Sequence, residues 1–120
     1  MAINARSVLS ILVSFIKANP EIGFEKIGVS PHIADKSVLW DSNREKYYHN
    51  YRNASFLDMG FHPPIIISLH RANGPDEVIV YRLDVRRDYI LLYIQGSEKN
   101  AFRRIDLESV QNISFKKIQR

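Results

Sequence analysis

The 120-residue chain contains no cysteine. This absence excludes disulfide frameworks, thiolate zinc sites and cysteine nucleophiles. Because a chain without disulfides suits a reducing compartment, we expect a cytoplasmic protein. Secretion is less well supported, since the apolar run VLSILVSFI (8–16) is short, is interrupted by two serines and ends at Lys17 without a small-residue cleavage pattern.

Motifs for several kinds of chemistry are also missing. The five glycines form no phosphate-cradling loop, and no G-x-S-x-G nucleophile elbow occurs. The four histidines are scattered and form neither H-x-x-x-H nor H-E-x-x-H. We therefore expect no metal and no cofactor. No apolar run has the length needed to span a bilayer, so we expect no membrane partner.

The composition that is present is that of an ordinary globular protein, with 45% hydrophobic and 25% charged residues. The length predicts a single domain over 1–120, with a helical and loop part in 1–60 and an antiparallel sheet in 61–120. Lysine and arginine number 17 against 13 aspartates and glutamates, which gives a net charge of +4. This basic excess favours a polyanionic partner.

Residues 5–18 have the apolar spacing of an amphipathic helix that buries Val8, Leu12 and Phe15. Asn4 is a suitable N-cap, because its side chain can accept a hydrogen bond from a free backbone N–H. The Asn-Pro pair that follows ends the helix, since the residue before proline avoids helical angles. This predicts the first element of the fold.

The region between this helix and the sheet has weaker signals. Residues 21–31 contain two glycines and a proline and predict at most one edge strand. A Ser-Asn-Arg-Glu capping box predicts a short helix over 42–52. The stretch FLDMGFHPP (56–64) is interpreted as a loop that its two prolines stiffen.

The second half predicts an antiparallel meander, because four apolar runs are separated by turn residues. These runs are 65–70, 77–85, 89–95 and 101–105. Three residues, Arg86 to Asp88, join the middle runs, which is hairpin length. In the run before this turn, alternation predicts that Ile79, Tyr81, Leu83 and Val85 share one face.

Residues 106–120 admit two interpretations. Leu107, Val110 and Ile113 keep a helical spacing, with Asp106 as the N-cap. A turn followed by a strand over 112–118 is the alternative. The predicted fold class is therefore α+β: an N-terminal helix packed on a four-stranded antiparallel meander, with a small SH3-like barrel as an alternative for the C-terminal half.

Tyrosines and arginines interleave in two places, and stacking combined with phosphate contact is how proteins hold unpaired RNA. One is NREKYYHNYR (43–52), and the other surrounds the predicted hairpin turn. The candidate nucleic-acid-binding residues are Arg44, Tyr47 and Arg52 in the first place, and Arg86, Arg87, Tyr89 and Arg104 in the second.

Structural explanations exist for both places. Asp84 and Asp88 flank the turn and can pair with Arg86 and Arg87 on a solvated surface. The tyrosines of 43–52 can pack against the sheet. Two neighbouring arginines, 103 and 104, point to opposite faces of a strand, so at most one of them joins the turn.

Three stretches together resemble the N-terminal part of ribosome-inactivating proteins, the RNA N-glycosylases. They are SFIK (14–17), IIISLHRANG (65–74) and EVIVYRLDVRRDYILLYIQG (77–96). In that family a tyrosine four residues after the Val of an Asp-Val-like pair stacks on the target adenine, and the resemblance implies this role for Tyr89. The family's catalytic glutamate and arginine lie in a second half that these residues do not include, so the resemblance implies no catalytic residue here.

Three functions are therefore in view. The first is a small basic binding module directed at RNA or a ribonucleoprotein. The second is an RNA-directed, toxin-like enzyme, either an N-glycosylase-like fragment or a small ribonuclease. The third is a protein interaction or inhibitor domain whose interface is either the edge of the sheet or an aromatic patch of Trp40 and the tyrosines of 43–52. Whether any catalysis occurs is left open by the sequence.

Overall fold

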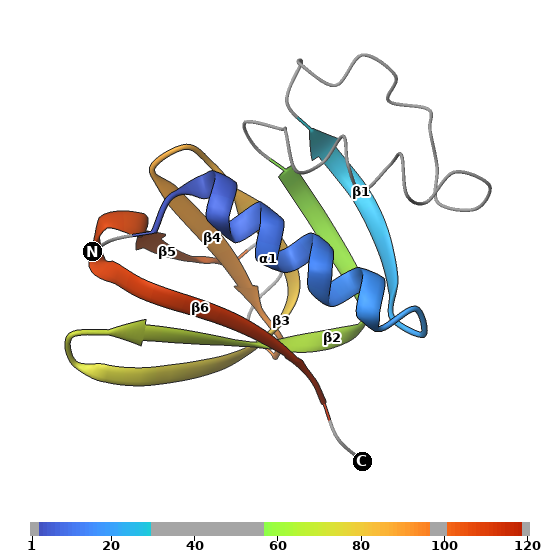
Figure 1. Cartoon of the computed structure of the whole chain (residues 1–120). Coiled ribbons are helices and arrows are strands. Elements are labelled where there is room, and N and C mark those ends of the chain that lie inside the picture. The colour runs from blue at the N-terminus through green and yellow to red at the C-terminus, as the bar shows by residue number, and fades with distance from the viewer. Residues whose placement is uncertain (1–2, 30–56, 97–100, 119–120) are drawn as a thin grey trace.

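In the computed structural model, which describes residues 3–29, 57–96 and 101–118, one helix packs on an antiparallel sheet (Figure 1). The predicted helix over 42–52 lies outside the described residues. The elements in chain order are α1 (Ala5–Ala18), β1 (Gly23–Val29), β2 (Leu57–Arg71), β3 (Gly74–Val85), β4 (Tyr89–Ile94), β5 (Arg103–Asp106), the 3-10 helix η1 (Leu107–Ser109) and β6 (Val110–Lys117).

The first helix confirms the prediction in its bounds and its cap. The Asn4 side chain accepts a hydrogen bond from the Ser7 backbone N–H at 2.9 Å. Val8 and Leu12 are buried, and Phe15 is half-buried against the ring of Phe115 at a centroid distance of 5.9 Å. The helix thus covers the sheet with the face that its sequence predicts.

The sheet begins earlier in the chain than predicted. The loop interpretation of 56–64 is wrong, because β2 is a single 15-residue strand that starts at Leu57. Its two prolines fall where the register with β3 shifts, between Gly60 and Ile65, and a strand tolerates residues without an N–H at such an irregularity. The edge strand that 21–31 allowed is present as β1, which pairs with the first part of β2.

The strands form an open six-stranded sheet with the order β1-β2-β3-β4-β5, and β6 also pairs with β2. β1 pairs with residues 57–62 of β2, and β6 pairs with residues 65–71. β3 pairs with both parts of β2 along one edge of that strand. β1 and β6 therefore lie along the opposite edge of β2. The four-stranded meander is therefore extended at its β2 edge by two further strands, and the SH3-like barrel is wrong for the described strands.

The C-terminal segment follows the strand alternative. Only one 3-10 turn, η1, precedes β6. The helical spacing of Leu107, Val110 and Ile113 has another origin: all three are buried, but a register shift near the start of β6 places Val110 opposite Arg71 and Asn112 opposite His70. An irregularity in a strand has produced a pattern that resembles helical periodicity.

The core lies between α1 and one face of the sheet. Leu83 and Val85 point into it, as predicted. A register shift between Val80 and Arg82 turns the strand, so Val80 is buried whereas Ile79 is 39% exposed and Tyr81 is half-buried. The prediction that Ile79 and Tyr81 share one face with Leu83 and Val85 is wrong for this reason. Among the described helices, none is long and apolar enough to cross a membrane.

Leu12→Ala tests the packing of α1 on the sheet. Because Leu12 is 1% exposed, its truncation leaves a cavity and is expected to lower the free energy of unfolding by about 2–5 kcal/mol. Ser10→Ala, on the exposed face of the same helix, should change it by less than about 0.5 kcal/mol. Urea denaturation of the two variants measures the difference, and equal stabilities would contradict this architecture.

Candidate nucleic-acid interface

The sheet face turned away from α1 carries charged and aromatic side chains, and we call it the outer face. The register defines it, because directly paired residues point to the same side of a sheet. Asp58 pairs with Asp84, Asp84 with Leu91, and Leu91 with Arg104. The outer face comprises Asp58 on β2, Arg82 and Asp84 on β3, Tyr89, Leu91 and Tyr93 on β4, Arg104 and Asp106 on β5, and Phe102 directly before β5.

Two buried carboxylates on this face each hold an arginine through two hydrogen bonds. Arg82 donates to Asp58 at 2.9 and 2.7 Å, and Arg86 donates to Asp84 at 2.8 and 2.9 Å. These side-chain hydrogen bonds raise the pKa of both guanidinium groups above the ordinary value for arginine. Both arginines are therefore fixed in position, and their charge is largely neutralised by a carboxylate.

Tyr89 and Arg104 form a stacked pair at the turn end of the outer face. The Arg104 guanidinium lies 3.9 Å from the centroid of the half-buried Tyr89 ring. Arg104 also donates to Asp106 at 3.1 Å, which holds the guanidinium in place. The Arg86 backbone N–H donates to the Tyr89 carbonyl at 2.9 Å and closes the predicted hairpin.

A second aromatic group lies farther along the same face. The Arg82 guanidinium is 4.4 Å from the Tyr93 ring centroid. The Tyr93 ring also contacts Tyr81 and Phe102, with centroids 6.1 and 5.7 Å apart. Phe102 is 55% exposed, whereas Tyr93 is 8% exposed. The sequence analysis did not select Phe102 or Tyr93, although the two-residue spacing of Phe102 and Arg104 was a signal that they share a face.

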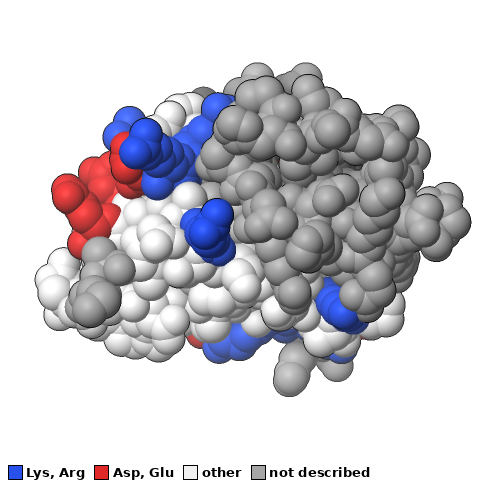
Figure 2. All heavy atoms as spheres, turned by 45° about the horizontal axis from the view of Figure 1, so that its top comes forward, with Lys and Arg blue, Asp and Glu red and all other residues white. Residues whose placement is uncertain are grey.

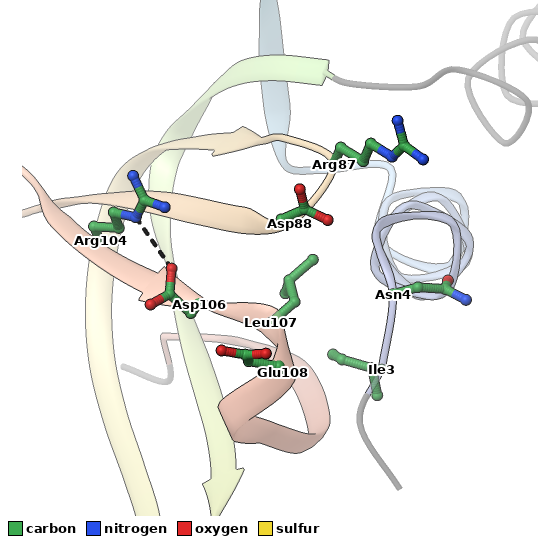
Figure 3. Close-up of a pocket in the computed structure, with 8 residues that line it drawn as sticks. All are labelled: Ile3, Asn4, Arg87, Asp88, Arg104, Asp106, Leu107 and Glu108. Atoms are coloured by element: carbon green, nitrogen blue, oxygen red, sulfur yellow. Dashed lines mark hydrogen bonds and ion pairs between the residues drawn. The ribbon is translucent and has the colours of Figure 1, made fainter.

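A pocket of about 430 Å³ opens beside the turn, between the start of α1, the β3–β4 turn and the β5–η1 segment (Figure 3). The Leu107 backbone N–H donates to the Asp88 carbonyl at 2.9 Å and joins η1 to the turn. The pocket has mixed charge, with two arginines and three acidic residues. It is lined by Ile3, Asn4, Arg87, Asp88, Arg104, Asp106, Leu107 and Glu108.

The four candidate residues of the hairpin region, Arg86, Arg87, Tyr89 and Arg104, lie in the β3–β4 turn or on the strands beside it; Arg104 contacts Tyr89, whereas Arg87 lines the other side of the pocket (Figure 3). The arginines differ in whether their charge is already paired with a carboxylate. Arg86 is bonded to Asp84, as the structural explanation predicted, whereas Arg87 is exposed and has no ion pair with any described residue. The other ion pair of that explanation, between Asp88 and Arg87, is not found within the described part of the chain.

The remaining candidates separate from this group. Arg103 pairs with Asp76 at 2.7 Å, and its partner in the register, Leu92, points into the core, so Arg103 and Arg104 do point to opposite faces. The three candidates of the first stretch, Arg44, Tyr47 and Arg52, lie outside the described residues, and so do Trp40 and the other tyrosines of 43–52.

On the face drawn in Figure 2, the described basic residues do not form one continuous patch. Figure 2 shows basic and acidic side chains adjoining at one end of the face that it draws, with uncharged surface between this group and other basic residues. Several lysines and arginines have a carboxylate partner, for example Lys117 with Glu21 at 2.9 Å. An unpaired cation such as Arg87 is therefore a more selective feature than the net charge.

Asp58→Ala tests whether the buried ion pair holds the outer face together. Removing a carboxylate that is 9% exposed takes both acceptors from Arg82, and we expect a loss of about 1–3 kcal/mol in the free energy of unfolding. Asp106→Ala is the matched control, since its pair with Arg104 is more than half exposed on both sides and should contribute about 0–1 kcal/mol. Similar losses in the two thermal melts would refute a structural role for the Asp58 pair.

Comparison with family models, with curated proteins and with solved structures found no match to this chain. The comparisons therefore supply no family and no activity. The outer face and the pocket beside it are interpreted from their own chemistry.

Proposed function

We propose that this protein is a small binding module for single-stranded RNA, free or within a ribonucleoprotein. The observation that carries the proposal is the Arg104–Tyr89 stack, together with an exposed Arg87 in the adjoining turn that has no ion pair with any described residue. The contact surface is the turn end of the outer face, formed by the β3–β4 turn, the start of β4 and β5.

The chemistry of this surface suits an unpaired nucleotide. A base stacks on an aromatic ring at a typical gain of about 1–3 kcal/mol, and arginine adds cation–π and phosphate contacts. The Tyr89 ring is half-exposed, and the guanidinium 3.9 Å from its centroid is itself held by Asp106. Arg87 has no carboxylate partner among the described residues, so its charge is available to a phosphate.

RNA is favoured over a protein partner by the kinds of side chain at this end of the sheet. Aromatic rings and guanidinium groups lie in direct contact here, and bases and phosphates are the ligands that use both. Unpaired nucleotides are favoured over a duplex, because a base within a duplex does not expose its flat face to a tyrosine. The aromatic anchors proposed for a protein partner lie outside the described residues and supply no competing geometry.

Salt dependence tests this function directly. Affinity for a single-stranded oligonucleotide should fall steeply as salt rises, because phosphate contacts release counterions. Arg87→Gln should weaken binding to all sequences and reduce the logarithmic salt slope by about 1. Lys117→Gln is the matched control, because it removes the same charge at the far end of β6 and should leave the slope unchanged. Absence of binding by the wild-type protein at low salt would refute the proposal.

The resemblance to ribosome-inactivating proteins supports a second candidate, an RNA N-glycosylase-like activity. The observation that favours it is the position of Tyr89, which follows the Asp84-Val85 pair across the turn and presents a half-exposed ring. Base stacking is common to both candidates, and they differ in whether a bond is broken. We propose no catalytic residue.

Incubation with intact ribosomes separates the two candidates. As a binding module, the protein should associate with ribosomes without releasing adenine or cleaving RNA. Liquid chromatography for free adenine and gel analysis of the ribosomal RNA measure both outcomes, with Tyr89→Ala as the control for dependence on the stacking residue. Adenine release by the wild-type protein that this variant lacks would establish the N-glycosylase alternative, and cleaved RNA would indicate a ribonuclease.

A further inference from the structure

Phe102 is the most exposed large hydrophobic side chain among the described residues, at 55%, and its ring has a fixed support. It packs on Tyr93 at a centroid distance of 5.7 Å with the planes tilted by 53°. Tyr93 is in turn held by the Arg82 guanidinium at 4.4 Å, and Asp58 fixes that guanidinium. Phe102 is therefore the outermost member of a supported group rather than a loose surface residue.

This group lies in line with the proposed RNA contact. Tyr89 and Tyr93 are on the same face of β4, and four residues of strand separate them by about 13 Å. On the neighbouring chain segment Arg104 stacks on Tyr89, and Phe102 packs on Tyr93. The outer face thus has two contacts between an arginine and a tyrosine along β4, one at Tyr89 with Arg104 and one at Tyr93 with Arg82.

We propose, resting on the RNA-binding function above, that the outer face holds two neighbouring unpaired nucleotides, with one base on the Arg104–Tyr89 stack and the second on Phe102. Sheets that bind RNA stack two or three bases on aromatic side chains of one face. Phe102 exposes a ring that Tyr93 supports, and RNA is the proposed occupant because this ring lies on the same face as the Arg104–Tyr89 stack.

The two positions differ in their electrostatics. Near the Tyr89 position, Arg87 in the turn has no ion pair with any described residue and can attract a phosphate. At the Phe102 position Arg82 donates from Nε and Nη2 to the Asp58 carboxylate, which neutralises its charge, so it supports the Tyr93 ring and offers no phosphate contact. The second position therefore contributes stacking, whereas the first contributes stacking and phosphate contact.

Three variants test this assignment in binding titrations with a short oligouridine at several salt concentrations. Phe102→Ala should weaken binding about tenfold, because the base loses its stacking partner. The salt slope should stay unchanged, because no phosphate contact is removed. Phe102→Trp should keep the affinity, since it retains a flat ring. Ile79→Ala is the matched control, because Ile79 is also exposed, at 39%, but has no ring, and it should bind as the wild type does.

Oligonucleotides with an abasic site at each position in turn show whether a base is involved. At one position the abasic site should weaken wild-type binding and abolish the effect of Phe102→Ala. If the wild-type protein binds the intact oligonucleotide, and Tyr89→Ala weakens this binding while Phe102→Ala does not, the second position is overturned and the RNA-binding function stands. If the Phe102→Ala loss is the same with every abasic site, base stacking at Phe102 is overturned. If the wild-type protein binds no RNA, both proposals fall.

Discussion

The antiparallel ladder of β2 is the interaction on which the rest of the structure depends. β2 pairs with β3 along both of its parts, and it divides its other edge between β1 and β6. Its residues Ile65, Ile67 and Leu69 are fully buried, so the same strand also supplies the middle of the core. The position of α1 follows from this ladder, because α1 packs against β6 and β3, both of which β2 holds.

Alternation along these strands produces two faces of opposite character. Leu57 and Met59 point to the core, and Asp58 between them points to the outer face. A shift of β2 by one residue would turn Asp58 into the apolar core, away from Arg82 on β3. The Asp58–Arg82 ion pair therefore opposes such a slip, and the order of the outer face is a consequence of how the strands pair.

The sequence predicts those parts of the fold that depend on neighbours along the chain. The helix over 5–18 and its Asn4 cap are local features, and so is the hairpin around Arg86 to Asp88, and all three are confirmed. The start of β2 was missed because prolines disfavour a strand unless an irregularity accommodates them. The register shift after Gly60 that does so depends on the pairing with β3 and cannot be recognised from the neighbouring residues in the sequence.

The site is harder to predict, because its contacts join segments distant in the chain. Arg82 and Asp58 are 24 residues apart, and Arg104 reaches Tyr89 only through the pairing of β4 with β5. Sequence analysis selected Arg86, Tyr89 and Arg104 from their residue types. It offered the pairing of Arg86 with Asp84, but it placed this pair on a solvated surface and could not show that Asp84 is buried, because burial depends on how the strands pair.

The hydrogen bond from the Ile3 backbone N–H to the Val110 carbonyl, at 3.1 Å, has a consequence for how the chain folds. It joins the residue before the N-cap of α1 to the first residue of β6, and most of the chain lies between them. The β2–β3–β4 meander needs only short loop closures, whereas α1 and β6 meet through contacts of high sequence separation. Folding rates fall as such separation grows, so docking of α1 and β6 onto a preformed meander is the expected slow step.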